Sequence, residues 1–383
     1  MAKTYLINYR VEINMKYRNI TKISVTSVLI SFAMHANAGI SVVDNEKGSF
    51  SIGGDVEFDF NYMNFDSTSK NWQLDQTGRI LLNFAGERLT SNDNYLRMQV
   101  SPTYAQSGNV GLDDAWFSFG QLNGPDIRIG RFESYDMFPL GQDTFIDHSG
   151  DTSDGLISDS GAYIYRTKEG RGRSSDGQIM YSQTFNNLYV ELNALLGDRS
   201  SLFGDTYHGN PVEKGDDAFV IRPVIAYTKD AFTVAASIER NLTSDAVTAN
   251  GIDIMDRTGY GLRTSYSTED LSVHASLAYM DAVDETNATA GVNILYKGFG
   301  LGYIFAHNEY DNEQFSGWFE GDVNVSTIYT SYQFTNVMNV KDFSIYTGAF
   351  QSVAKEKNVK SGTGTYADGE DDIGLRVRFK YLF

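Results

Sequence analysis

Carboxylate side chains are concentrated in one stretch of the chain, with arginines just before it. The run from Gly130 to Gly161, GRFESYDMFPLGQDTFIDHSGDTSDGLISDSG, contains one glutamate and six aspartates, and no basic residue follows Arg131 within it. Carboxylates attract cations and accept hydrogen bonds from hydroxyl groups, whereas arginines donate them. Side chains of these two kinds, facing each other across water, would select polar solutes.

Histidine-based catalysis is an alternative chemistry. A hydrolase needs a histidine beside a serine or aspartate partner. The histidines after residue 38 are His148, His208, His274 and His307, and no nucleophile motif surrounds any of them. Acidic pairs such as Asp216-Asp217 are usually only solvated. We therefore expect no enzymatic activity, no cofactor and no metal site.

Alternating side chains identify the elements that position the charged residues. From Ile373 to Phe383, apolar and aromatic residues occupy every second position, and Arg376, Arg378 and Lys380 lie between them. Lipid would not accept three charges on one side of a strand, and a soluble sandwich would not usually bury them. The pattern therefore predicts a strand with lipid on one face and an aqueous lumen on the other.

The same weak alternation recurs along the chain in segments of roughly ten residues. It predicts 16 strands, and hence an all-β, 16-stranded antiparallel transmembrane barrel whose lumen is wide enough for water. The predicted strands are 50–62, 77–88, 95–104, 112–119, 126–132, 178–185, 188–196, 218–228, 232–240, 257–266, 271–280, 288–296, 299–310, 323–334, 343–353 and 372–383.

The connections between these strands alternate in length. Short ones include Asn186-Asn187 and Lys297-Gly298, whereas long ones include 197–217 and 241–256. Short periplasmic turns and long external loops are typical of outer-membrane barrels. An even number of strands also closes the sheet without free edges. A soluble β-sandwich and a β-helix are the alternative folds, and neither explains the lumen-side charges together with this alternation.

The N-terminal residues have the features of a cleaved signal peptide. Lys16, Arg18 and Lys22 precede the apolar stretch Ile23 to Met34, and the small-residue motif Ala36-Asn37-Ala38 follows it. We expect residues 1–38 to be removed, leaving 39–383 as a single barrel domain. Since Met15 alone opens a normal signal sequence, it is a candidate for the true start.

Composition narrows the classes of function further. The chain has 383 residues and no cysteine, and residues 39–383 carry 26 basic and 48 acidic side chains, a formal net charge of −22. The negative charge disfavours nucleic acid as a partner. Without disulfides, a large closed sheet must hold an exported chain together. No run approaches the roughly 20 apolar residues of a membrane-spanning helix.

At the acidic run the sequence resembles the general outer-membrane porins, in which the loop after the fifth strand folds into the lumen and narrows it. Gly130-Arg131 ends the fifth predicted strand, Pro139-Leu140-Gly141-Gln142-Asp143 looks like the tip of that loop, and Phe383 fits the aromatic C-terminus. Gly130 to Asp147 looks more like the raffinose-type glycoporins, which pass oligosaccharides. The stretch Gly161 to Gly177 departs from the usual loop exit.

The resemblance implies a pore constriction between wall arginines and loop carboxylates. Strand parity directs Arg79, Arg97 and Arg128 inward, because the residues beside them are apolar. The constriction residues we expect are Arg79, Arg97, Arg128, Arg131, Glu133, Asp136, Asp143 and Asp147. For any single arginine, a salt bridge that only pins the loop is an equal alternative.

Sugar selectivity would also need aromatic faces inside the lumen, because pyranose rings stack on them. The same parity argument directs Trp116 inward, and further aromatic residues lie in the acidic run. The candidate sugar contacts are therefore Trp116, Tyr135, Phe138 and Phe145. Most other aromatic residues are better assigned to the girdles at the membrane interfaces.

The sequence therefore predicts an outer-membrane porin through which small hydrophilic solutes diffuse, with a preference for sugars. A cation-leaning general porin is the first alternative, and a receptor barrel or an outer-membrane hydrolase follows. The expected partners are outer-membrane lipid and the diffusing sugars and ions. The family resemblance adds a homotrimer.

Overall fold

The computed structural model describes residues 39–46, 48–64, 72–90, 92–142, 163–167, 177–361 and 370–383. All described residues belong to one compact unit. The predicted signal peptide lies outside the described residues. Within the described part of the chain, no helix is long and apolar enough to cross a membrane.

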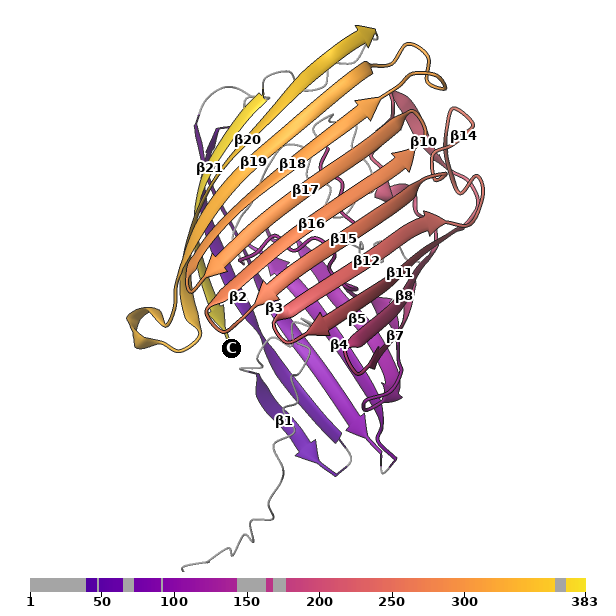
Figure 1. Ribbon diagram of the computed structural model, residues 1–383. Helices are drawn as coiled ribbons and strands as arrows, with labels where there is room; N and C mark the ends of the chain where they lie inside the picture. The colour runs from indigo at the N-terminus through magenta and orange to yellow at the C-terminus, as the bar shows by residue number, and fades with distance from the viewer. Residues whose placement is uncertain are drawn as a thin grey trace, which may run out of the picture. The chain divides into compact units, whose positions relative to one another are not determined.

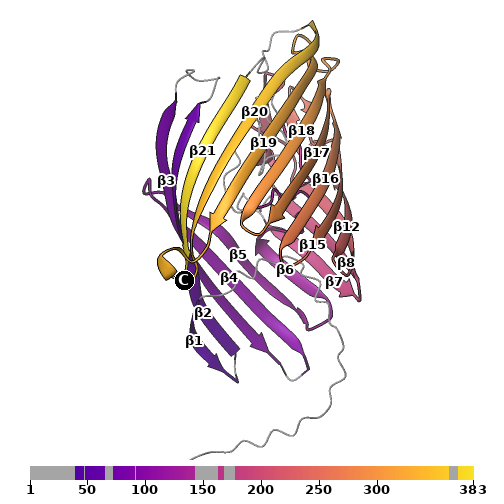
Figure 2. The same cartoon turned by 60° about the vertical axis from the view of Figure 1, so that its left-hand side comes forward.

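Sixteen antiparallel strands form a closed ring in which each strand pairs with the next and the last pairs with the first (Figures 1 and 2). In ring order they are β2 (Gly48–Asn64), β3 (Gln73–Leu89), β4 (Asn94–Ala105), β5 (Val110–Gln121), β6 (Asp126–Arg131), β7 (Gln178–Phe185), β8 (Leu188–Gly197), β11 (Ala218–Lys229), β12 (Phe232–Asn241), β15 (Thr258–Ser267), β16 (Leu271–Ala282), β17 (Glu285–Tyr296), β18 (Phe299–Tyr310), β19 (Glu320–Phe334), β20 (Phe343–Ser361) and β21 (Glu370–Leu382).

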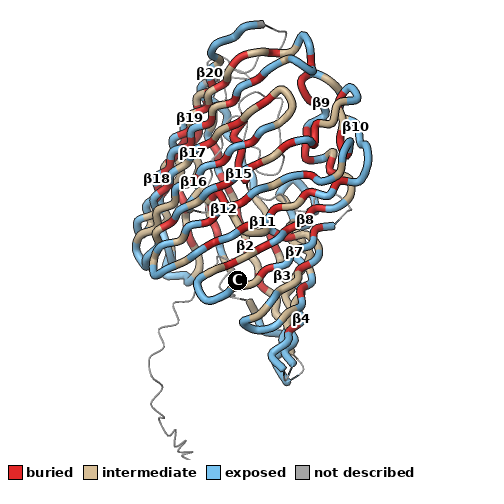
Figure 3. Tube along the Cα trace, turned by 45° about the vertical axis from the view of Figure 1, so that its right-hand side comes forward, coloured by how far each residue is buried: buried red, intermediate tan, exposed pale blue. Residues whose placement is uncertain are grey.

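The two faces of the ring follow the predicted alternation. On β4, Leu96 and Met98 are 45% and 49% exposed on the outer face, while Arg97 between them is less exposed and faces inward. Figure 3 shows the same alternation of buried and exposed residues along the strands. Because side chains of a strand point to opposite faces in turn, a period of two separates the apolar outer surface from the polar interior.

All 16 predicted strands are present, with boundaries that differ from the prediction by a few residues in most cases. The first short strand, β1 (Ile40–Asn45), was not predicted. It pairs with the start of β2, from Ile52 to Gly48, while β21 pairs with the rest of β2 from Asp55 onward. The strand β1 therefore lies on the same edge of β2 as β21.

At the long-loop end, a second, four-stranded sheet lies outside the ring pairing. Its strands are β9 (Thr206–Tyr207), β10 (Asn210–Lys214), β13 (Val247–Ala249) and β14 (Ile252–Asp253). An apolar group that we call the loop-end cluster packs around this sheet. The cluster includes Leu202, Phe203, Tyr207, Val247, Ile254, Met255 and Phe315.

A buried polar pair accompanies the loop-end cluster. His208 Nε2 lies 3.3 Å from Glu285 Oε2, and neither side chain is exposed. The His208 ring stacks on Tyr207 with ring centroids 4.3 Å apart. The long loops at this end are therefore packed against one another and against β17.

Candidate functional site

The segment that follows β6 contacts the inner surface of distant strands. We call residues 132–142 the entering arm. Asn293 on β17 donates its side-chain N–H to Pro139 O at 2.6 Å, and the Tyr329 hydroxyl on β19 donates to Leu140 O at 3.0 Å. Both donors are buried side chains on the inner face of the ring. Since β17 and β19 lie far from β6 around the ring, the entering arm crosses the interior.

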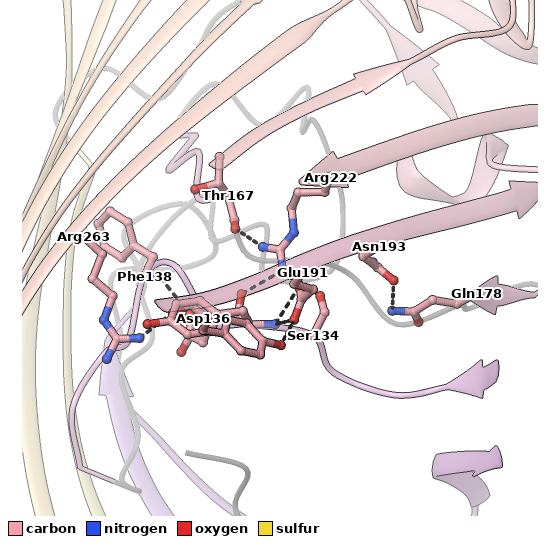
Figure 4. Close-up of polar contacts among 11 residues, drawn as sticks. Ser134, Asp136, Phe138, Thr167, Gln178, Glu191, Asn193, Arg222 and Arg263 are labelled. Carbon is pink, nitrogen blue, oxygen red and sulfur yellow. Dashed lines mark hydrogen bonds and ion pairs between the residues drawn. The ribbon is translucent and has the colours of Figure 1, made fainter. Parts of the chain in front are cut away.

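Two further strands hold the beginning of the entering arm. Arg263 on β15 donates through Nη1 to Asp136 O at 2.6 Å, and Arg222 on β11 donates through Nη2 to Tyr135 O at 2.8 Å (Figure 4). The carboxylate of Glu191 on β8 accepts a hydrogen bond from the Tyr135 main-chain N–H at 3.2 Å. The wall therefore binds the arm mainly through the arm's backbone.

Residues 163–167, which we call the returning arm, lie against the same side of the ring. Asn308 on β18 donates to Tyr163 O at 2.9 Å. The Tyr165 hydroxyl donates to Glu239 Oε1 on β12 at 2.5 Å. Burial raises the pKa of Tyr165 well above its usual value, as does the nearby Glu239, so the hydroxyl stays protonated and remains a donor.

An apolar cluster joins the two arms to the wall. It contains Phe138, Tyr163, Ile164 and Tyr165 of the arms together with inward residues of β16, β18, β19 and β20. Glycines on the wall make room for the arm side chains. A Cβ on Gly291 would lie 2.7 Å from the Phe138 ring, and one on Gly261 would lie 2.1 Å from Thr167 Oγ1. The inner faces of β8, β11, β12 and β15 to β20 are named here the loop-bearing wall.

The inner faces of β21 and β2 to β6 carry rows of charge and are named the charged wall. On β2 and β21 the acidic and basic side chains are register partners, Glu57 with Lys380 and Asp59 with Arg378. Lys380 Nζ lies 3.2 Å from Glu57 Oε2, and Arg378 contacts both oxygens of Asp59, at 2.8 and 3.0 Å. These charged side chains are buried.

Three of the four expected constriction arginines pair with acids on this same wall. Arg79 lies 3.8 Å from Glu57 and 3.9 Å from Asp55. Arg97 donates to Glu87 at 2.5 Å. Arg128 lies 3.7 Å from Asp126. The fourth arginine, Arg131 at the end of β6, donates to the main-chain oxygens of Leu112 and Asp113 on β5.

The expected acidic residues lie partly beyond the described part of the chain. Glu133 and Asp136 belong to the entering arm, and Asp136 Oδ1 accepts the Phe138 main-chain N–H at 2.8 Å. Asp143 and Asp147 lie outside the described residues. The opposition of loop carboxylates to wall arginines therefore stays a prediction.

The expected sugar contacts occupy three different surroundings, and Phe145 lies outside the described residues. Trp116 is half-buried on β5, and the Arg128 guanidinium lies 4.4 Å from its ring centroid. Tyr135 stacks on Tyr189 with centroids 5.5 Å apart. Phe138 is buried in the cluster against the loop-bearing wall. Of the three described residues, Phe138 is the least accessible to a solute.

A family model described as "Porin-like glycoporin RafY" matches residues 47–383. The chain belongs to this family of porins. It is an outer-membrane channel protein, and the match covers every strand of the ring. A search of curated proteins returned no match.

Solved porin structures share the fold of this glycoporin-family chain. OmpF of Salmonella typhi, in complex with daunomycin, has a TM-score of 0.59 at 11% identity and covers 89% of this chain and 100% of its own. The anion-selective porin from Comamonas acidovorans has a TM-score of 0.58 at 13% identity, with coverages of 88% and 100%. OmpT of Vibrio cholerae, in trimer form, has a TM-score of 0.56 at 12% identity, with coverages of 88% and 100%.

Porin membership and these neighbours suggest a channel rather than an enzyme. Among the described residues, no group of three or more histidine, aspartate or glutamate side chains is placed to hold a metal ion. The buried His208–Glu285 pair lies in the loop-end region, and His274 faces inward on β16. Neither histidine belongs to the charged wall.

The sequence analysis did not single out two groups of residues on the inner face of this porin. The acidic row Asp55, Glu57 and Asp59 alternates with Val56, Phe58 and Phe60, so the same parity argument that found the basic row of β21 would have found it. Arg222 and Glu191 carry no such distinctive signal. Their role depends on a loop that reaches them from elsewhere in the chain.

Proposed function

We propose that this porin is a water-filled channel for small hydrophilic solutes that favours oligosaccharides. The observation that carries the proposal is the division of the interior into two walls. The arms occupy the loop-bearing wall, which leaves the charged wall for solutes. That wall offers the half-buried Trp116, with the buried Arg128 guanidinium over one face of its ring. Sugars present C–H surfaces and hydroxyls to such a pair.

The proposal gives a role to every expected constriction residue except Arg131, which donates to main-chain oxygens of β5. Arg79 and Arg97 donate hydrogen bonds to solute hydroxyls, and their acidic partners Glu57 and Glu87 accept them. Glu133 and Asp136 face solutes from the loop, together with Asp143 and Asp147. Tyr135 extends the aromatic surface from the side of the loop.

We further propose that the mature chain begins at Gly39 after signal-peptide cleavage and that it assembles as a homotrimer in outer-membrane lipid. The continuous apolar outer face of the ring supports insertion in lipid. The trimeric form of the Vibrio cholerae neighbour supports the assembly. Cross-linking of the refolded protein tests it, and a product no larger than a monomer would contradict it.

The test of function is single-channel recording of the refolded protein in a planar bilayer, with maltose-series sugars or raffinose added to one side. Stepwise openings with reversible, sugar-dependent blocking are the expected result. Openings that no sugar blocks, whatever the length of the sugar chain, would indicate a general porin. No openings at all would remove the channel proposal and favour a receptor or a hydrolase.

A cation-leaning general porin is the second candidate, and the acidic loop favours it. Changing Asp136, Asp143 and Asp147 together to Asn removes three negative charges near the expected constriction. The reversal potential in a salt gradient should then shift toward lower cation preference, because fewer fixed charges attract cations. Changing the rim residues Asp216, Asp217 and Asp256 to Asn provides a matched control for net charge. Equal shifts in the two triple variants would remove the special role of the loop.

A further inference from the structure

We infer that Glu191 and Arg222 are positioning residues that hold the two arms together and thereby set the open cross-section of the pore. We call the pair the clasp. The inference rests on the proposed channel function and deepens it. It names the pair that fixes the geometry of the constriction, whereas the expected constriction residues face the solute.

The clasp joins parts of the loop that are about thirty residues apart in the chain. Arg222 Nη1 donates to Thr167 O of the returning arm at 2.6 Å. Its Nη2 donates to Ser134 Oγ at 2.6 Å and to Tyr135 O at 2.8 Å in the entering arm. Figure 4 shows the guanidinium between Thr167 and Ser134. A planar guanidinium presents several donors in fixed directions, so one side chain contacts both arms.

Glu191 completes the clasp from the neighbouring strand. Its Oε1 lies 3.4 Å from Arg222 Nη2, and its carboxylate accepts the Tyr135 main-chain N–H. The Tyr189 hydroxyl donates to Glu191 Oε2 at 2.6 Å, while the Tyr189 ring stacks on Tyr135. The backbone of Tyr135 is therefore held at both its N–H and its carbonyl oxygen.

The other wall side chains described above each hydrogen-bond to one arm, although the apolar cluster also packs against both. Arg263, Asn293 and Tyr329 bond to the entering arm. Asn308 bonds to the returning arm. Arg222 bonds to both, so its loss would allow the two arms to separate while each remains attached to the wall. The expected result is a looser constriction in an intact barrel.

The burial of the clasp fits a positioning role. The side chains of Arg222 and Glu191 are 2% and 1% exposed. Buried ion pairs are often replaceable without loss of stability, and their best attested use is to specify one arrangement among several. A solute therefore meets residues that the clasp positions, and it does not meet the clasp.

The experiment compares Arg222→Met with Arg240→Met in planar bilayers. Arg240 lies on the next strand, β12, and forms an exposed pair with Asp256 at 3.2 Å, away from the arms. Arg222→Met should give about a twofold rise in conductance, since the conductance of a water-filled pore grows with its open cross-section. It should also pass larger polyethylene glycols in liposome-swelling assays. Arg240→Met should match the wild type in both assays.

Two milder variants keep the inference testable where Arg222→Met does not fold. Arg222→Lys keeps the charge but loses the fork of donors, and Glu191→Gln keeps the size but loses the charge. Both variants should give conductances between those of the wild type and Arg222→Met, with more frequent current fluctuations. A change in gel mobility when each protein is heated in detergent establishes that its barrel was folded before heating.

The outcomes separate the clasp from the proposed function. Folded Arg222→Lys and Glu191→Gln proteins with wild-type conductance, noise and size limit would overturn the clasp, even if the wild type is blocked by sugars. A wild type that opens but ignores sugars would overturn only the sugar preference, because conductance and the polymer size limit still report on the clasp.

Discussion

Arginines on the two walls of this barrel bind different kinds of partner. On the loop-bearing wall, Arg222 and Arg263 donate to main-chain carbonyl oxygens of another segment. On the charged wall, Arg376 and Arg378 contact carboxylates of the neighbouring strand. One set of arginines therefore attaches a loop, and the other compensates charge within the sheet.

The difference shows that one alternation of inward and outward side chains can serve two different functions. The outer face is largely apolar, because every second residue of each strand points toward lipid. On the charged wall, rows of opposite charge on β2 and β21 place acidic and basic side chains beside each other within the sheet. On the loop-bearing wall, glycines and neutral donors leave space for the arms instead.

The largest expected effect comes from breaking the charged wall where the ring closes. Asp59→Ala would remove the carboxylate that Arg378 and Arg376 contact at 2.8 and 3.3 Å, and Arg378 would keep only the contact with Glu57 at 3.2 Å among its described carboxylate partners. Removing one partner of a buried pair costs about 3–5 kcal/mol. Urea unfolding followed by tryptophan fluorescence measures this loss.

The exposed pair of Arg240 and Asp256 provides the control for the closure of the ring. Asp256→Ala should change the free energy of unfolding by less than about 1 kcal/mol, because exposed pairs contribute little. If Asp59→Ala were no more destabilising than Asp256→Ala, the buried ion pairs of the charged wall would contribute no more to stability than an exposed pair. Exchanging the two charges, with Asp59→Arg and Arg378→Asp together, should restore part of the lost stability.

An intermediate effect is expected from filling space on the loop-bearing wall. In Gly291→Ala the added carbon would lie 2.7 Å from the Phe138 ring, so the entering arm must move toward the open side of the lumen. Overpacking of this kind costs about 1–3 kcal/mol. Conductance should fall, and single-channel recording measures the change. Gly204→Ala, whose nearest atom would lie 3.8 Å away, should leave conductance unchanged. Wild-type conductance in Gly291→Ala would show that the arm does not rest on this wall as described.

The smallest effect should come from Trp116→Ala on the charged wall. Loss of the aromatic face should weaken sugar binding by about 0.5–1.5 kcal/mol, the usual contribution of an aromatic pair beyond its buried area. The sugar concentration that half-blocks the current should rise, while the conductance in salt changes little. Phe117→Ala, on the neighbouring outward position, is the matched control. A proportional change in sugar flux and ion conductance would make Trp116 a simple wall residue.

The strands could be predicted because each carries its own signal. Segments such as 299–310 and 372–383 alternate strictly, so period and turn residues locate them without knowledge of their neighbours. Asn186 and Asp230, for instance, have φ of 53° in short turns, a conformation that these residue types tolerate. The strands at the long-loop end are two to five residues long and too short to carry a period.

The candidate site was less predictable because its contacts join distant segments. Parity directed Arg97 and Arg128 inward, and the structure agrees. It did not indicate that their partners would be Glu87 and Asp126 on the same wall. The pairing of Arg222 with carbonyl oxygens 55 and 87 positions away has no local signature at all.

The loop-end cluster bears on how antibodies would recognise this porin. Apolar side chains from residues 202–207, 246–255 and 315 share one core, beside the buried His208 and Glu285. With the long loops facing outside the cell, as is typical of outer-membrane barrels, the exposed epitopes are assembled from several loops at once. Immunisation with a peptide copied from one loop would therefore present a conformation that the intact cell does not display.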